Sequence, residues 1–383
     1  MKAHRTLIVM CATLMAGFVG VPPGLGAGKE ATMCNGTWQF QQLPTNRGFA
    51  SVFSGISGTG SADVWAVGAF ATLHVPLIEH WDGTRWRNVK VPAPSGAESG
   101  LGGVLALAPD DAWAVGGYSS AEGSGPLAEH WDGTRWRIIP SPSKGTGAGL
   151  MAVSGTSSVD VWAVGTYRDR NNVAQTLIEH WDGSRWRIVA SPGSPSGGNV
   201  LYDVVAISTE DVWAVGSSIE GALIEHWDGT AWKIVQSPNP GDFNELFGVD
   251  AASATDIWAV GYQQVLGSSE QVLTIHWDAS SWSVISAQNV PGSTTNNLRS
   301  VWAISSSDAW AVGFDVQGSP AAAFTLAEHW DGTSWTIVPT PDLGTLGSRL
   351  TGVWAASSTD LFAVGWALKD QSRQRPLAMR NCA

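Results

Sequence analysis

The chain has 383 residues, of which 33 are acidic and 21 are basic, so its formal net charge is −12. It contains no basic run or basic stripe, which argues against nucleic acid and against an anionic membrane surface as partners. Its length would ordinarily suggest two or three domains, but an internal repeat predicts a single one.

Residues 1–27 have the features of a secretory signal peptide. Lys2 and Arg5 precede an apolar stretch over Leu7–Val21, which ends at Pro22 ahead of small residues up to Ala27. The apolar stretch is shorter than the roughly 20 residues that a membrane span needs. We therefore expect a secreted protein whose single folded domain covers residues 28–383.

One sequence unit then occurs seven times. Each copy contains an Asp-x-aromatic-Ala-Val-Gly string, and most copies continue with Glu-His-Trp-Asp-Gly and a further Trp. The strings begin roughly 45 to 52 residues apart, which is the period of a four-stranded propeller blade. Their first residues are Asp63, Asp111, Asp160, Asp211, Asp256, Asp308 and Asp360.

Each unit divides into four short apolar runs separated by turn residues. In the fourth unit the runs are Val204–Ile207, Val212–Val215, Ala222–Trp227 and Trp232–Val235. Runs of this length and composition are typical of β-strands, here named a to d from the centre outward, and no helical periodicity is present. The sequence therefore predicts an all-β fold, a seven-bladed β-propeller with four antiparallel strands per blade.

The d strand occurs only six times in its usual place, and the missing copy lies at the start of the chain. Asn35–Pro44 matches the segment that contains strand d in the other units, so we expect it to complete the last blade beside Leu377–Arg380. This pairing would close the ring and remove its open edges. Cys34 and Cys382 both fall at the resulting hairpin tip, and in an exported chain we expect them to form a disulfide. The alternative is two unrelated thiols near the chain ends.

The repeated polar residues resemble a catalytic motif but recur too often to be one. Neighbouring residues on a strand point to opposite faces, and copies in different blades cannot converge on one substrate. We expect instead that the repeated Asp, His and Trp side chains satisfy one another within or between blades, with sugar stacking at a rim as the alternative for the Trp residues. The pairs are Glu79-His80, Glu129-His130, Glu179-His180, Glu225-His226 and Glu328-His329.

The hairpin segment His80–Trp86 resembles a shortened Asp-box of sialidase-type propellers. Its Trp-Asp step is similar to WD repeats, although the Gly-His step of that family is absent. Spacing and ring size over residues 35–382 resemble secreted kelch or galactose-oxidase-like propellers. The resemblance implies the fold but leaves the activity open, because these families include enzymes, lectins and scaffolds.

The b–c loops and the d-to-a loops should share one face, and they vary in length and content, so this variable face is the candidate binding face. Aromatic residues are expected just after strand b, where they line pockets or close the ends of the blades. These ligand-binding candidates are Phe70, Tyr118, Tyr167, Tyr262, Phe314 and Trp366.

Arginines form the second candidate set, at the mouth of the central channel. Arg47, Arg299 and Arg349 belong to the neighbouring blades one, six and seven, and such a cluster can hold a carboxylate or sulfate through paired hydrogen bonds, unless the arginines are merely solvated. Acidic residues are expected opposite them, and Tyr202 on the far side, while His74 has no evident carboxylate partner. The acidic residues are Asp203, Asp242 and Glu245.

These features favour a secreted, monomeric binding module that recognises carbohydrate or a cell-surface polymer through similar loops around one rim. One alternative is a polysaccharide hydrolase or lyase at the channel mouth, and another is a protein-interaction scaffold. We identify no catalytic residue, metal-ligand spacing or cofactor motif, and so expect no metal or cofactor; whether the chain is an enzyme stays open.

Overall fold

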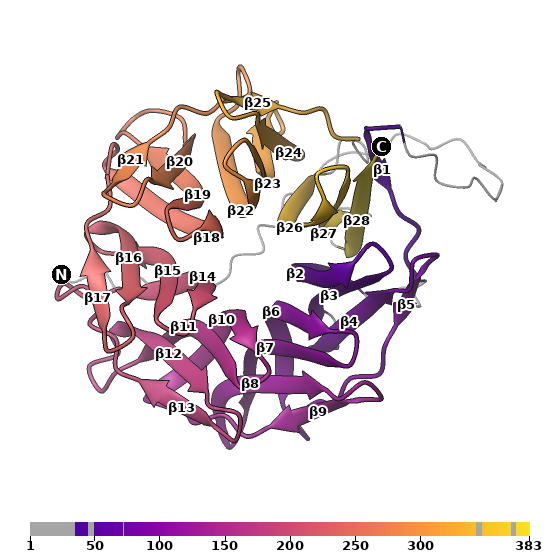
Figure 1. The fold of residues 1–383 in the computed structure, drawn as a ribbon, viewed down its shortest axis with the longest axis vertical. Helices are drawn as coiled ribbons and strands as arrows, with labels where there is room; N and C mark the ends of the chain where they lie inside the picture. The colour runs from indigo at the N-terminus through magenta and orange to yellow at the C-terminus, as the bar shows by residue number, and fades with distance from the viewer. Residues whose placement is uncertain (1–34, 45–49, 72, 342–346, 369–372) are drawn as a thin grey trace.

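A computed structural model describes residues 35–44, 50–71, 73–341, 347–368 and 373–383. Within these residues the chain forms 28 β-strands, arranged as seven four-stranded antiparallel sheets around a central axis (Figure 1). The predicted seven-bladed propeller is confirmed. No helix in the described part of the chain has the length and hydropathy needed to cross a bilayer.

The first four blades follow one another along the chain, each with its strands in the order a to d. Blade one consists of β2 (Ser51–Gly60), β3 (Asp63–Phe70), β4 (Val75–Trp81) and β5 (Trp86–Asn88). Blade two consists of β6 (Glu98–Ala108), β7 (Asp111–Ser120), β8 (Gly123–Trp131) and β9 (Trp136–Ile139). Blade three consists of β10 (Thr146–Ser157), β11 (Asp160–Arg168), β12 (Ala174–Trp181) and β13 (Trp186–Val189). Blade four consists of β14 (Val200–Ser208), β15 (Asp211–Ser218), β16 (Gly221–Trp227) and β17 (Trp232–Val235).

The last three blades complete the ring. Blade five consists of β18 (Phe243–Ser253), β19 (Asp256–Gln264), β20 (Gln271–Trp277) and β21 (Trp282–Val284). Blade six consists of β22 (Thr295–Ser305), β23 (Asp308–Gln317), β24 (Ala322–Trp330) and β25 (Trp335–Ile337). Blade seven consists of β26 (Ser348–Ser357), β27 (Asp360–Leu368), β28 (Gln374–Cys382) and, from the other end of the chain, β1 (Trp38–Phe40).

The repeated Ala-Val-Gly string is buried because each b strand lies between two neighbouring blades. Its glycine is required by the close approach of strand a, where that strand bulges. A Cβ atom on Gly261 would lie 1.8 Å from the carbonyl oxygen of Glu245, and one on Gly313 would lie 1.9 Å from that of Asn297. Any side chain there would push strand a out of the ring.

The repeated Asp, His and Trp residues form the internal network that the sequence predicts. In blade three the His180 Nε2 atom lies 2.6 Å from Asp160 Oδ1, and the imidazole stacks on the Trp162 indole at a centroid distance of 4.2 Å. Trp162 also packs edge-on against Trp232 of the next blade at 5.5 Å. The same Asp–His pair occurs in six blades, so these residues hold sheets together and do not form a shared active site.

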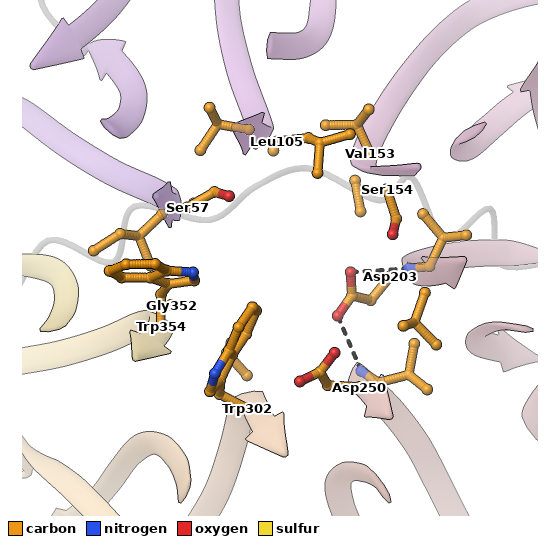
Figure 2. A pocket seen from close by; sticks show the side chains of 18 of the residues that line it. Ser57, Leu105, Val153, Ser154, Asp203, Asp250, Trp302, Gly352 and Trp354 are labelled. Carbon is orange, nitrogen blue, oxygen red and sulfur yellow. Dashed lines mark hydrogen bonds between the residues drawn. The ribbon is translucent and has the colours of Figure 1, made fainter. Parts of the chain in front are cut away.

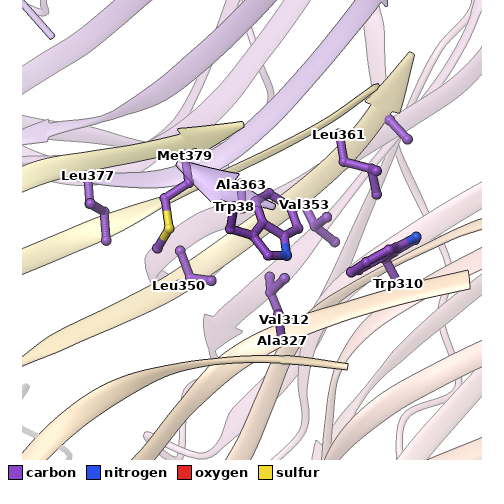
Figure 3. Packing of buried hydrophobic residues seen from close by; sticks show 11 residues of the cluster. Trp38, Trp310, Val312, Ala327, Leu350, Val353, Leu361, Ala363, Leu377 and Met379 are labelled. Carbon is purple, nitrogen blue, oxygen red and sulfur yellow. The ribbon is translucent and has the colours of Figure 1, made fainter. Parts of the chain in front are cut away.

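The predicted closure of the ring is also confirmed. Strand β1 pairs with β28, Trp38 opposite Asn381, and the Trp38 side chain is buried in the core between blades six and seven (Figure 3). Its ring meets that of Trp310 edge-on at 5.8 Å. The amide of Gly36 donates a hydrogen bond of 2.8 Å to the carbonyl oxygen of Cys382. Cys34 and the signal peptide over residues 1–27 lie outside the described residues, so the disulfide and the leader stay predictions.

Candidate functional site

The seven a strands surround a central channel with a cavity of about 410 Å³ (Figure 2). Asp203 and Asp250 project into it from blades four and five, and Trp302 and Trp354 project from blades six and seven. Because the a strands of neighbouring blades do not pair, their inner amides need other acceptors. Side chains from the preceding blade fill that role, so the channel carboxylates have a structural task.

The two aspartates show how this works. Asp203 Oδ2 accepts a hydrogen bond of 2.9 Å from the Val249 amide, and Asp250 Oδ2 accepts one of 2.8 Å from the Ala303 amide. Ser57, which occupies the register of Asp250 in blade one, accepts the equivalent hydrogen bond from the Ala106 amide at 3.1 Å. Burial raises the pKa of Asp203 and of Asp250 to about 7. Asp203, expected from the sequence to lie opposite the arginines at the mouth, lies deeper, inside the channel, since its strand bulges there.

A second cavity of about 460 Å³ lies at the mouth of this channel on the variable face, over blades four to seven. Tyr202, Phe247 and Arg299 line both cavities, so the mouth pocket opens into the channel. The mouth pocket is lined by Tyr202, Glu245, Phe247, Tyr262, Glu270, Thr295, Asn297, Arg299, Phe314, Val316 and Arg349.

Arg299 and Arg349 belong to a stack of alternating aromatic rings and guanidinium groups, here called the arginine ladder: Phe247, Arg299, Phe314, Arg349 and Trp366. The Arg299 guanidinium carbon lies 3.9 Å from the Phe247 ring centre and 5.4 Å from that of Phe314. The Arg349 guanidinium carbon lies 4.0 Å from the Phe314 ring centre and 5.4 Å from that of Trp366. Cation–π contacts of this kind fix the planes of both guanidinium groups.

The aromatic rings of the ladder cover the flat faces of the two guanidinium groups. The N–H groups at the guanidinium edges have no hydrogen-bond acceptor among the described residues. Among the described residues, neither Arg299 nor Arg349 forms a hydrogen bond or an ion pair within 4.0 Å. The Nε atom of Arg349 is buried and unpartnered, and so is the Oδ1 atom of Asn297, whose side chain is only 3% exposed. Burial lowers the pKa of both arginines, and their proximity lowers that of Arg349 further. Buried donors without acceptors are costly, which makes the pocket attractive to an anion.

Acidic groups form the opposite wall of the mouth pocket. Burial raises the pKa of Glu245, while the charge of Arg299 and a hydrogen bond from Tyr262 act in the other direction. Burial likewise raises the pKa of Glu270, opposed by Arg299 and by a hydrogen bond from Thr295. The mouth therefore carries positive charge on blades six and seven and acidic groups on blade five.

Several expectations about this mouth need correction. Tyr202 does not lie on the far side from the arginines: its ring centre is 4.9 Å from that of Phe247, which in turn stacks on Arg299. Asp242 does not line the mouth pocket, because its Oδ2 atom accepts a hydrogen bond of 2.8 Å from the Leu266 amide in the neighbouring loop. Arg47 lies outside the described residues.

The predicted aromatic residues do not form one rim of equivalent sites. Phe70, Tyr118, Tyr167, Tyr262, Phe314 and Trp366 all belong to b strands themselves and do not follow them, since these strands extend further than expected. Tyr262 and Phe314 line the mouth pocket, and Trp366 contacts Arg349. The Tyr167 ring is covered by the Lys144 ammonium group at 4.7 Å.

Phe70 and Tyr118 line a separate pocket of about 520 Å³ over blades one to three. His74, for which the sequence indicates no carboxylate partner, lies in this pocket. In the structure its Nδ1 atom lies 3.7 Å from the Glu98 carboxylate, and both side chains are largely exposed. Ser99 lines the same pocket, and its hydroxyl is buried without a partner among the described residues.

Phe247, Asn297 and Glu270 were not predicted from the sequence. Phe247 occupies the repeat position of Arg299, directly after a leucine that pairs with the Ala-Val-Gly glycine, so aligning the a strands would have found it. Glu270 lies in a b–c loop, where the repeat gives no register. In the described part of the chain no cluster of three or more His, Cys, Asp or Glu side chains could hold a metal ion.

The seven four-stranded sheets define a β-propeller with a pocket at the mouth of its central channel. No protein-family profile and no curated protein matches the chain. Among solved structures it is similar to YCF48 bound to a D1 peptide, with 16% identity over 90% of this chain and 97% of that one and a TM-score of 0.56. It is similar to the RRP9 WD40 repeats, with 10% identity over 91% and 98% and a TM-score of 0.56. At these identities the similarity shows the fold alone.

A third similar structure is the extracellular domain of a putative hybrid two-component system, BT4673, from B. thetaiotaomicron. The identity is 10%, the match covers 90% of this chain and 40% of that one, and the TM-score is 0.54.

Proposed function

We propose that this chain is an exported protein-binding module that captures a carboxylate-bearing segment of a partner protein in the mouth pocket. The single observation that carries the proposal is the pair of half-buried guanidinium groups in the arginine ladder, whose N–H edges have no acceptor among the described residues. Guanidinium groups bind carboxylates through two parallel hydrogen bonds, and a fixed plane reduces the entropy lost on binding.

Protein is favoured over carbohydrate at this pocket because its aromatic faces are already in use. Phe314 is contacted by both guanidinium groups, and Phe247 by Arg299 and Tyr202. A sugar ring that stacked there would have to displace a cation. YCF48, which this chain resembles in fold, has been solved bound to a D1 peptide, and this agrees with the choice of a protein partner.

Hydrolysis at the channel mouth is the less favoured function. A tyrosine nucleophile requires a lowered pKa, whereas burial and the neighbouring Glu245 raise the pKa of both Tyr202 and Tyr262. The pocket thus offers binding groups and no activated nucleophile among these residues.

The test is peptide binding by the purified chain and by Arg299→Met and Arg349→Met variants. The probe is a pool of N-acetylated, C-amidated hexapeptides that contain glutamate, compared with the same pool carrying glutamine. We expect the glutamate pool to bind more tightly, and each variant to weaken binding about tenfold, the loss of one charge-assisted pair. Arg187→Met is the matched control, because Arg187 pairs with Asp182 at 2.6 Å on an outer strand. Equal binding by all four proteins would exclude the mouth pocket.

Carbohydrate binding is a second candidate function, and its candidate site is the pocket over blades one to three. That pocket combines the rings of Phe70 and Tyr118 with the unpartnered Ser99 hydroxyl, a mixture of stacking surface and hydrogen-bonding group. A glycan array probed with the chain and with Tyr118→Ala tests it: binding that the variant loses supports a lectin-like site.

A further inference from the structure

Beside the mouth pocket lies an exposed apolar surface, here called the rim patch: Phe243, Val265 and Leu266. These side chains are 50%, 53% and 72% exposed. Phe243 pairs with Gln264, directly before Val265, and the Leu266 amide bonds to Asp242, directly before Phe243. Two loops of blade five are thus tied together and present three apolar side chains to solvent. Exposed apolar groups that gather in this way mark interaction surfaces.

The rim patch and the mouth pocket share one side of strand β18. Side chains alternate along a strand, so Phe243, Glu245 and Phe247 point to the same side, whereas the intervening Asn244 and Leu246 are 3% and 0% exposed. Phe243 is at the rim, and Glu245 and Phe247 line the pocket. Two residues of extended chain span about 7 Å and four span about 13 Å, so Glu245 and Phe247 lie at about those distances from Phe243 along strand β18. Because Arg299 stacks on Phe247 at 3.9 Å, an extended segment of two residues reaches from the patch to the pocket, and one of four residues reaches the Phe247 end of the arginine ladder.

The unpartnered groups in the pocket specify the chemistry of an occupant. The buried Nε–H group of Arg349 requires an acceptor, and the buried Oδ1 atom of Asn297 requires a donor. A carboxylate with a backbone amide close by supplies both. A fatty-acid carboxylate or the phosphodiester group of a phospholipid supplies the acceptor only.

We propose that the partner presents an extended segment with an acidic side chain and, two to four residues away, a large apolar side chain. The carboxylate binds the arginine ladder, a backbone amide of the segment donates to Asn297, and the apolar side chain packs on the rim patch. This inference rests on the proposed function and adds the spacing of the two anchors.

The probes are synthetic decapeptides of glycine and serine, acetylated and amidated so that neither terminus carries charge. Each contains one glutamate and one leucine at a spacing of two, three, four or seven residues. Control peptides replace glutamate by glutamine or leucine by serine. We expect dissociation constants about tenfold lower at one of the spacings from two to four than at seven, with the leucine contribution lost in the serine peptide. Equal affinity at all spacings overturns the inference.

Variants of the chain separate this inference from the proposed function. Phe243→Ser and Leu266→Ser should remove the advantage of leucine but keep the preference for glutamate over glutamine. Arg349→Met should remove the preference for glutamate. Val159→Ser is the control, because Val159 is 57% exposed in an a–b turn on the opposite face. If both rim variants retain the leucine advantage, the rim patch is not the second anchor, whatever the arginine variants show. Stronger binding to anionic lipid vesicles than to any peptide would also overturn it.

Discussion

Arg380 binds Asp360 through both oxygens, with Nε to Oδ1 at 2.7 Å and Nη2 to Oδ2 at 2.8 Å. It occupies the position that histidine holds in the other six blades, and its guanidinium carbon lies 4.8 Å from the ring centre of Phe362, which replaces the usual Trp. Blade seven thus keeps the same arrangement, a flat polar group that stacks on an aromatic ring and binds the b-strand aspartate. It does so although arginine replaces histidine and phenylalanine replaces tryptophan. This position of the repeat therefore needs a flat hydrogen-bond donor and does not need imidazole chemistry.

His180→Ala should therefore destabilise the fold without affecting ligand binding. It leaves Asp160 without its histidine and exposes one side of Trp162, so we expect a loss of about 1–3 kcal/mol in the free energy of unfolding. Urea denaturation measures the loss, and peptide binding below the transition measures function. Arg187→Ala, which removes an exposed ion pair, should cost less than about 1 kcal/mol. A variant as stable as the parent that no longer binds peptide would contradict the structural role.

Glu129 should make the chain less stable as the pH rises. Both of its carboxyl oxygens are buried without a hydrogen-bond partner among the described residues, and burial raises its pKa to about 8. Glu179 and Glu225 at equivalent positions accept hydrogen bonds from Ser141 and Ser191 of the preceding blade, at 2.7 and 2.6 Å. In blade one the residue at the repeat position of Ser141 and Ser191 is Val91, which has no hydroxyl to donate to Glu129.

Because the folded-state pKa is raised, the contribution of Glu129 is complete below about pH 4.5 and is lost as the pH rises through about 8. Glu129→Ile, the residue that blade five has at position 275, should raise the free energy of unfolding by about 1–3 kcal/mol at pH 8.5 and much less at pH 5. Val91→Thr supplies the missing hydroxyl and should reduce the pH dependence. A Glu129→Ile variant with the parent's pH profile would show that Glu129 is not the responsible group.

Asp250 should also make the chain less stable as the pH rises, over a lower pH range than Glu129. Burial raises its pKa to about 7, so its contribution to stability is complete below about pH 4 and is lost as the pH rises through about 7. Asp250→Ser keeps an acceptor for the Ala303 amide, since Ser57 and Ser154 occupy the same register in their blades. Thermal melts at pH 4.5 and 7.5 should differ less for the variant than for the parent chain. An unchanged difference would point to other carboxyl groups.

Trp38→Ala should cost about 3–5 kcal/mol in the free energy of unfolding, as expected for a fully buried aromatic side chain. Trp38 is 3% exposed and packs on Trp310 across the blade boundary. The exposed neighbour Gln42 provides a control, and Gln42→Ala should change the free energy by less than about 0.5 kcal/mol. A mild effect at Trp38 would mean that the ring does not depend on its N-terminal strand.

Cys34→Ser should lower the melting temperature of the oxidised chain and abolish any shift on adding reductant. The chain-entropy model gives about 4–5 kcal/mol as an upper estimate for so long a loop. Mass spectrometry of the unreduced chain checks the pairing with Cys382 directly. A reductant-sensitive melt that persists in the variant would assign the effect to another bond.

The fold could be predicted from the sequence because it follows from a repeated unit. The site could not be predicted in the same way, because its residues lie at positions that differ from one repeat to the next. The period and the missing d strand predicted the number of blades and the partner of β1. Arg299 and Arg349 were predicted as a pair from their places in adjacent blades. The aromatic rings that orient these arginines were not predicted, because their stacking depends on side-chain conformations across three blades. Tyr202 was misplaced for a related reason: near the axis, blades that are not neighbours in the ring still meet across one pocket.

The pairing of β1 with β28 also determines when the molecule can be completed during synthesis. Among the described strands, β1 leaves the ribosome first, yet the strand that it pairs with, β28, is made last. Until then blade seven has no outer strand and the first blade faces an unfilled gap, so a partly made chain presents strand edges to other chains. Blades one to six can form in order, each from local hairpins, whereas the final step joins residues separated by almost the whole sequence and is therefore the slow one.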